Sequence, residues 1–200
     1  MNIKGVFEIQ LETKEDFRGF LMETDDDRVF KKHGINTVWV KEYQNLSLKK
    51  GTIRGLHFQL PPYAQAKLVR VIYGETLYVF VDLRKDSPTL GKWSSVLLSA
   101  ENKKMLYIPR GFAHAFCSLA DNTMAICKMD NPYSPESEYQ IKWNDPDLDI
   151  DWQLEDAPIV SPKDSNNKSF KEFIAKHGAI ETYPWITKCF LKLASCLGIL

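Results

Sequence analysis

Residues 75–82 read Glu-Thr-Leu-Tyr-Val-Phe-Val-Asp, a composition and alternation typical of a β-strand. Leu77, Val79 and Val81 occupy alternate positions, and the small, aromatic and charged residues occupy the positions between them. Successive side chains of a strand point to opposite faces. One face should therefore meet an aliphatic core and the other could line a cavity, although alternation alone also allows the aromatic face to cover the outside of a sheet.

Similar runs rich in β-branched and aromatic residues occur on both sides of this stretch. Residues 37–40 and 67–71 are two of them, and Gly, Pro and Asn separate such runs as far as about residue 155. Many short strands at this spacing predict a mainly β fold, either a sandwich or a barrel.

The pattern changes after Pro158. Residues 169–177 have apolar side chains at helical spacing and Gly178 just beyond, which predicts a short helical appendage with a glycine C-cap. Residues 185–200 carry an apolar stripe opposite lysines, but they are too short and too charged to span a bilayer. We favour packing on the protein itself or on a partner subunit over an interfacial membrane helix, and expect one domain over 1–182 with an amphipathic tail over 183–200.

Composition restricts the class of protein. The chain has 200 residues, of which 44% are hydrophobic, enough for one sizeable core. Its 26 basic and 26 acidic residues cancel without long blocks, which argues against a nucleic-acid groove or a polybasic membrane patch. The four cysteines lack CxxC spacing and the N-terminus lacks the apolar core of a signal peptide, so we expect a reduced, cytoplasmic protein.

The densest cluster of reactive side chains lies in residues 51–70. Arg54, His57 and Lys67 fall within fourteen positions, and together they could bind phosphate and move protons. Taken singly, a histidine such as His57 is more often structural, and charges such as Arg54 and Lys67 are more often solvated on the surface. Arg54 and His57 are three positions apart, so an ideal strand would point them to opposite faces. A bulge at Gly55 could reconcile them, as could a ligand that spans the rim of a barrel.

Several motifs follow one another in unbroken order over about residues 5–170: RGLHFQ, PP with QAKLVRV, GE with VDLR and SPTLGKW, IPRGFAHAF, KWNDPDLDIDW and SPKD. In this order they resemble the successive signatures of the dTDP-4-dehydrorhamnose 3,5-epimerase family. The resemblance implies a cupin-like jelly-roll β-barrel, usually a homodimer. It also implies epimerisation at C3, C5 or both of a nucleotide-diphosphate 4-keto-6-deoxy sugar, for surface polysaccharide or deoxysugar biosynthesis.

The resemblance assigns the reacting groups. A 4-keto group acidifies the neighbouring C–H bonds, so a base can form an enolate, and return of the proton to the other face inverts the carbon. His57 matches the family's base, Asp164 the carboxylate that orients it, and Lys67 the cation beside the C4 oxygen. Common metal-binding cupins carry GxHxH, whereas Gln59 stands two residues after His57, so we expect neither metal nor cofactor.

The resemblance also assigns substrate-binding positions. Arg18 and Arg54 suit a diphosphate, because guanidinium groups bind phosphate in bidentate geometry. Tyr133 matches the ring that stacks on the nucleotide base. The remaining positions are Glu23, His114, Glu138, Lys163 and, with a register ambiguous by a residue or two, Gln44.

Two positions depart from the family pattern. Cys127 stands where the family usually has the tyrosine that donates a proton opposite the histidine. A thiol is protonated at neutral pH but is several ångströms shorter than a phenol. Tyr78 stands where the family usually has aspartate. Tyr78 could be a relocated acid, water could replace the acid with inversion of one carbon, or both changes could be independent drift.

Two other functions fit the same residues. A related keto-sugar isomerase would begin with the same proton abstraction but shift the carbonyl. A catalytically weakened sugar-nucleotide binding protein would keep Arg54, Glu138 and Tyr133 without turnover. Deuterium incorporation at C3 and C5 separates the binding protein from an epimerase, and product NMR separates the isomerase.

Overall fold

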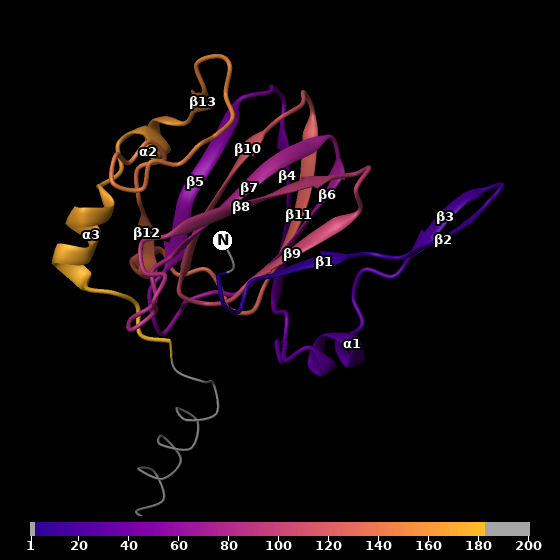
Figure 1. The fold of residues 1–200 in the computed structure, drawn as a ribbon, viewed down its shortest axis with the longest axis horizontal. Coiled ribbons are helices and arrows are strands. Elements are labelled where there is room, and N and C mark those ends of the chain that lie inside the picture. The colour runs from indigo at the N-terminus through magenta and orange to yellow at the C-terminus, as the bar shows by residue number, and fades with distance from the viewer. Residues whose placement is uncertain (1–2, 183–200) are drawn as a thin grey trace, which may run out of the picture.

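Two facing β-sheets form the body of the protein in the computed structural model, which describes residues 3–182 (Figure 1). The first, here the β4 sheet, has the order β1-β9-β6-β11-β4, and the second, here the β5 sheet, has the order β12-β5-β10-β7-β8 with β13 beside β5. The strands of the β4 sheet are β1 Phe7–Gln10, β9 Lys104–Ile108, β6 Lys67–Tyr73, β11 Thr123–Met129 and β4 Lys41–Ser47. Those of the β5 sheet are β12 Glu138–Gln140, β5 Thr52–Gln59, β10 Phe112–Ser118, β7 Glu75–Asp82, β8 Trp93–Ser99 and β13 Ile159–Val160. The mainly β, double-sheet architecture predicted from the sequence is confirmed.

Both faces of β7 are buried. Tyr78 and Phe80 point between the sheets and pack in one core with residues such as Leu106. Val79, on the other parity, packs in a second core beneath the C-terminal segment, against Phe173 and Trp152. The alternative in which the aromatic face of this strand covers the outside of a sheet is therefore wrong. Each large apolar side chain buried in this way contributes about 1.5–3 kcal/mol to folding.

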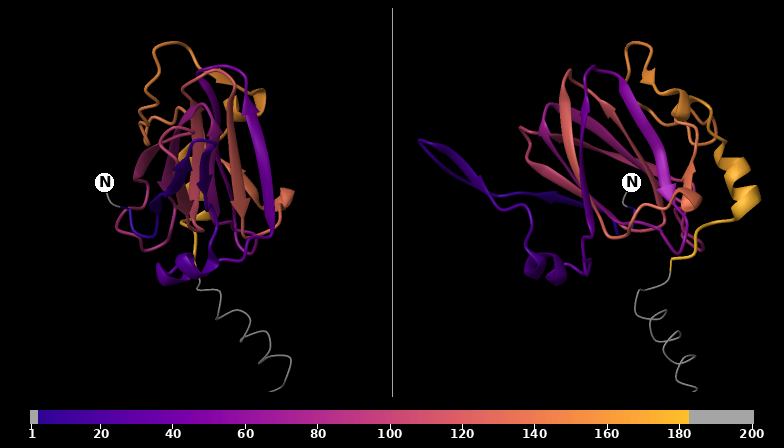
Figure 2. Two further views of the ribbon diagram at one scale, coloured as in Figure 1. Left: turned by 90° about the vertical axis from the view of Figure 1, so that its right-hand side faces the viewer. Right: turned by 180° about the vertical axis from the view of Figure 1, so that it is seen from behind.

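The C-terminal segment supplies the cover of the β5 sheet. It contains the 3₁₀ turn Pro135–Ser137, α2 Pro162–Ser165 and α3 Phe170–His177, and Figure 2 shows α3 beside that sheet. Ser169 caps α3 with a capping box that includes Glu172, and Gly178 is its C-cap with φ 69°. The predicted helix at 169–177 is confirmed. The predicted tail at 183–200 lies outside the described residues.

The N-terminal region covers the outer face of the β4 sheet and also extends away from it. Phe30 of α1 Asp27–Lys32 and Ile35 pack on Leu68 of β6. The hairpin of β2 Thr13–Asp16 and β3 Gly19–Met22, here called the arm, projects from the barrel (Figures 1 and 2). Its apolar residues Phe17, Phe20 and Leu21 are exposed.

Two of the three segments predicted as strands are strands in the structure. Residues 67–71 lie in β6 and residues 76–81 in β7. Residues 37–40 do not form a strand, because β4 begins at Lys41, opposite Met129 at the end of β11. Beyond Met129 the neighbouring strand ends, so residues 37–39 have no partner in the ladder, and Val38 is exposed.

Strand β5 contains the irregularity expected at Gly55. On β10, His114 pairs with His57 and Phe116 with Arg54, so three residues of β5 span two of β10. Gly55 has φ +122°, and an added Cβ would lie 2.5 Å from Ala115 Cβ and 2.6 Å from His114 O. Only glycine fits this position, and the extra residue breaks the strict alternation between Arg54 and His57.

Candidate active site

A cavity of about 190 Å³ opens between the two sheets. Both sheets contribute side chains to it. From the β4 sheet and the loop before β6 come Lys41, Tyr43, Gln65, Lys67 and Met129. From the β5 sheet and the loop before β12 come His57, Phe58, Gln59, His114, Tyr133 and Glu138. Ligands of a double-sheet barrel bind in such an interior space. The cavity brings together the histidine and the lysine that the sequence singled out.

His57 and Asp164 form a close pair at the cavity wall. His57 Nε2 lies 2.7 Å from Asp164 Oδ1, although 107 positions separate the two residues. The C-terminal segment folds back over β5 through α2, which Ser161 caps by accepting from the Asp164 N–H. Burial raises the pKa of Asp164, but the hydrogen bond and charge of His57, together with hydrogen bonds from Ser161 and Gly55, hold that pKa below its ordinary value. With Nε2–H donated to this carboxylate, Nδ1 of His57 is left as the basic nitrogen.

Lys67 is a buried cation at the start of β6. Its Nζ donates to Gln65 Oε1 at 3.0 Å, and both side chains line the cavity. Burial lowers its pKa from the ordinary lysine value, while the neighbouring Cys127 and Asp130 act in the opposite direction. A buried positive charge of this kind would stabilise an oxyanion formed beside it.

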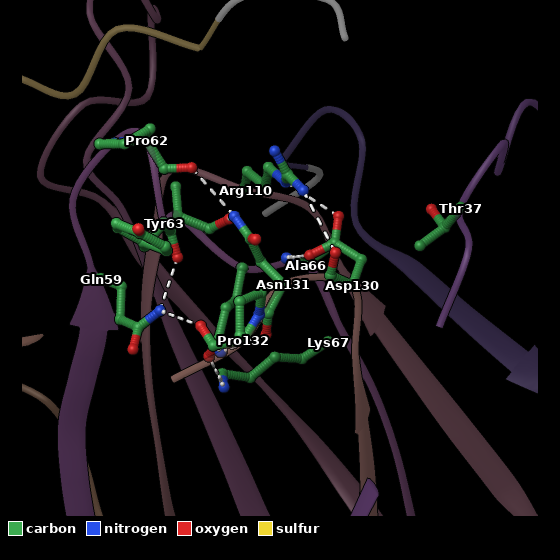
Figure 3. A network of polar contacts seen from close by, with 12 residues as sticks. Thr37, Gln59, Pro62, Tyr63, Ala66, Lys67, Arg110, Asp130, Asn131 and Pro132 are labelled. Carbon is green, nitrogen blue, oxygen red and sulfur yellow. Dashed lines mark hydrogen bonds and ion pairs between the residues drawn. The ribbon is translucent and has the colours of Figure 1, made fainter. Parts of the chain in front are cut away.

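Hydrogen bonds join two loops next to Lys67 (Figure 3). Gln59 Nε2 donates to Tyr63 O at 2.6 Å and to Pro132 O at 3.1 Å, and Asn131 Nδ2 donates to Pro62 O at 3.0 Å. These bonds hold the loop after β5 against the loop after β11. Gln59, which also lines the cavity, is therefore held by backbone groups of both loops.

A second histidine lies beside the first. His114 pairs in register with His57, and its Nδ1 lies at hydrogen-bond distance, 3.0 Å, from Tyr78 Oη. Burial, followed by the charges of Lys67 and His57, lowers the pKa of His114 well below 6.5. Burial raises the pKa of Tyr78 well above 10, so the phenol keeps its proton and can donate it to Nδ1. In the tautomer that accepts this bond, His114 is a neutral ring with its proton on Nε2.

Aromatic and charged groups line the outer part of the cavity. Tyr133 Oη donates to Glu138 Oε2 at 2.8 Å, and Lys163 Nζ lies 2.9 Å from the same oxygen. Lys41 Nζ lies 5.4 Å from the centre of the Tyr133 ring. The predicted residues Tyr133, Glu138 and Lys163 are thus brought together.

Four residues predicted for the site are placed elsewhere. Arg18 lies in the turn of the arm, where it bonds to Asp16, and Glu23 is exposed just after the arm. Gln44 points to the other face of β4, with Nε2 2.8 Å from Met124 Sδ, and does not line the cavity. Arg54 donates to Leu46 O and Ser47 Oγ instead of lining the cavity.

The two unusual positions also differ from the sequence-based expectation. Cys127 is 2% exposed and does not line the cavity, and burial raises the pKa of its thiol. Tyr78 is equally buried and reaches His114 instead of the cavity surface. Neither residue lines the cavity, and their assignment as catalytic groups stays a prediction.

Sequence reasoning missed Tyr43 and Lys41. The alternation that exposes Gln44 points Tyr43 inward, and on the same face Asn45 has a buried amide oxygen without a partner in the described part of the chain. Counting parity backward from the buried Ser47 could have found them. The mixed polarity of residues 41–47 hides that signal.

Within residues 3–182 the structure has neither a metal-ligand cluster nor a membrane-spanning helix. No group of three or more His, Cys, Asp and Glu side chains there could hold a metal ion. In the same residues no helix is long and apolar enough to cross a membrane.

Comparisons with known proteins identify the family. The family model described as dTDP-4-dehydrorhamnose 3,5-epimerase matches residues 1–172. The chain belongs to the dTDP-4-dehydrorhamnose 3,5-epimerase family. A Shigella flexneri relative with that name is 47% identical over 156 residues, which are 78% of this chain and 85% of the relative.

Solved structures of related sugar epimerases share the fold. A Legionella pneumophila dTDP-6-deoxy-D-glucose-3,5-epimerase in complex with dTDP-4-keto-L-rhamnose has a TM-score of 0.85 and 37% identity, covering 92% of this chain and 97% of that chain. A double mutant of a Streptomyces bikiniensis 3′-monoepimerase in complex with dTDP has a TM-score of 0.84 and 29% identity, covering 92% of each chain. The cupin-like jelly roll implied by the sequence resemblance is confirmed. One of these two similar proteins is named for two inverted positions and the other for one.

Proposed function

We propose that this family member epimerises C3, C5 or both of a nucleotide-linked 4-keto-6-deoxy sugar through an enolate. The observation that carries the proposal is the 2.7 Å contact between His57 and Asp164, at the wall of a cavity that also holds the buried cation Lys67. Enolate chemistry beside a ketone has two requirements. One is a base that a carboxylate holds in place, and the other is a cation that stabilises the developing oxyanion.

His57 is proposed as the base. Asp164 accepts the Nε2–H, fixes the tautomer and stabilises the imidazolium that forms when Nδ1 takes the proton. The electrons of the broken C–H bond pass into the enolate, and its charge collects on the C4 oxygen. Lys67 and the Nε2–H of His114 are the donors proposed for that oxygen, because both line the same cavity.

The outer part of the cavity is proposed to hold the nucleotide. Tyr133 offers a flat ring for the base, and Lys163 and Glu138 offer a polar pair beside it. Arg54 lies on the same strand as His57, where its guanidinium could exchange its bonds to Leu46 and Ser47 for diphosphate oxygens. Because two related structures contain dTDP or a dTDP-sugar, we propose a dTDP-linked substrate.

We also propose a cytoplasmic homodimer in which the arm reaches the partner. Phe17 is 99% exposed, and Phe20 and Leu21 beside it are also exposed, which is an unusual cost for a hairpin that projects from the barrel. Arg18 and Glu23 lie on or just after this arm, and neither lines the cavity of its own chain. In a dimer they could approach the partner's cavity, which would account for their match to family substrate-binding positions.

Incubation with several 4-keto nucleotide sugars in D₂O tests the function. The expected result is deuterium at C3 or C5 together with an inverted product in the NMR spectrum, unchanged by a chelator. Exchange with a shifted carbonyl would indicate the keto-sugar isomerase. Tight binding of dTDP without exchange on any substrate would indicate a binding protein and contradict the proposal.

A further inference from the structure

We propose that Tyr43 is the group that protonates the enolate on the face opposite His57. This assignment rests on the function proposed above and adds to it a catalytic residue on β4. Inversion needs two groups, because the base that removes the proton from one face cannot return it to the other. The cavity must therefore present a proton donor across from His57.

The two sheets provide the required opposition. His57 comes from β5, in the β5 sheet, whereas Tyr43 comes from β4, in the β4 sheet, and both line the same cavity. A sugar ring lying between the sheets would have His57 toward one of its faces and Tyr43 toward the other. Lys67 lies on β6 in the same sheet as Tyr43, close to the oxygen that carries the enolate charge.

Other proton donors in the region are less well placed. Cys127 is buried and outside the cavity lining, and the Tyr78 hydroxyl is engaged with His114. Tyr133 lines the cavity but is half exposed and donates to Glu138. Tyr43 combines a phenolic hydroxyl, a position in the cavity wall and substantial burial.

Tyr43 also takes over the space next to position 127. Cys127 of β11 pairs in register with Tyr43 of β4, so the two side chains are neighbours on one face of the sheet. A small side chain at 127 leaves room for a phenol that enters the cavity from the adjacent strand. The family's missing tyrosine and the inward-pointing Tyr43 are then two parts of one rearrangement.

The surroundings keep this phenol protonated until it reacts. Burial, followed by the neighbouring Cys127, raises the pKa of Tyr43 well above 10, while the charge of Arg54 acts in the opposite direction. The hydroxyl therefore carries its proton at neutral pH, and a cation is present to stabilise the phenolate after transfer.

The proton balance closes without an oxidant or a reductant. His57 takes the proton from C3 or C5, and the C–H electrons form the enolate. The Tyr43 O–H bond then breaks, its proton forms the new C–H bond on the opposite face, and the C4 carbonyl is restored. The imidazolium returns its proton to water and the phenolate takes one from water, which resets both groups.

The test is Tyr43→Phe, which removes only the hydroxyl, with Tyr73→Phe on an exposed tyrosine at the end of β6 as the matched control. In D₂O we expect Tyr43→Phe to lower formation of the inverted product by about 10²–10⁴-fold. His57-dependent exchange on the original face and dTDP affinity should stay close to those of the parent. Tyr43→Phe/Cys127→Tyr should recover part of the inversion, because it returns a phenol from the adjacent strand.

Each contrary result has its own meaning. Inversion by Tyr43→Phe at the parent's rate overturns the assignment, and so does loss of exchange and inversion together with dTDP binding intact. Loss of dTDP affinity would make Tyr43 a binding residue and overturn it as well. A parent that neither exchanges nor inverts any 4-keto sugar refutes the proposed function itself, and this inference with it.

Discussion

His57 and His114 are neighbours in register on adjacent strands and line the same cavity, yet they have different partners. His57 faces the carboxylate of Asp164, whereas His114 faces the phenol of Tyr78. A carboxylate favours an imidazole that gains a proton, while a buried phenol holds a neutral ring. The partner behind each ring, more than the ring itself, decides which histidine is a base and which is a fixed donor.

The largest expected effect comes from removing the base. His57→Ala should lower deuterium exchange at both C3 and C5 by about 10²–10⁴-fold, because no other group takes the proton. Calorimetry should find dTDP affinity nearly unchanged, since His57 does not contact the nucleotide in the proposed mode. His33→Ala, at the exposed end of α1, is the control and should behave like the parent. Full exchange by the variant would end the assignment of His57.

Removing the charge of its partner should have the next largest effect. Asp164→Asn keeps a polar side chain but can donate to Nε2 and so favour the wrong tautomer, and we expect roughly a 100-fold loss in kcat. KM should change little, because Asp164 lies behind His57. Steady-state kinetics with the best substrate measures kcat and KM separately. An equal loss in dTDP affinity would mean that Asp164 holds the C-terminal segment and not the base.

Disrupting the pair of Tyr78 and His114 should have a smaller effect on the reaction. Tyr78→Phe removes the hydrogen bond to His114 Nδ1, worth about 1 kcal/mol, so exchange and inversion should fall together by about fivefold. Both rates come from one D₂O time course. A selective loss of inversion would instead identify Tyr78 as the proton donor and contradict the role of Tyr43.

The smallest effect concerns pH and stability. Since the pKa of His114 is lowered in the folded protein, the unfolded chain binds a proton more readily, and stability falls as pH drops below the ordinary value of 6.5. His114→Gln should lessen that fall. Urea midpoints on both sides of that pH, compared between parent and variant, measure the difference. Identical pH dependence would mean that His114 is solvated when protonated.

Local signals in the sequence predicted local structure well. The helix at 169–177 was predictable because its cap residues and apolar spacing lie within one segment. The strand at 76–81 was equally clear, but the direction of each face was not, because the covering C-terminal residues lie far along the chain. Tyr43 was missed and Gln44 chosen because their facing depends on pairing with β11, about 80 residues away.

Site residues were predictable where they lie within a family motif, or where the order of the family motifs along the chain identifies them. His57, Lys67 and Asp164 follow that rule, and the structure brings His57 and Asp164 together. Arg18 and Glu23 were also predicted from motif position, yet one chain does not bring them to the cavity. No sequence pattern tells whether a residue serves its own subunit or a neighbouring one.

The bulge at Gly55 makes the site hard to transplant. The same residue lies against the backbone of His114, separates Arg54 from His57, and gives its N–H to Asp164. A designer who copied only the reacting side chains into another barrel would lose their relative phase along the strand. The transferable unit is the pair of strands β5 and β10 with their mismatch of one residue, and a single methyl group at position 55 would disturb binding and chemistry at once.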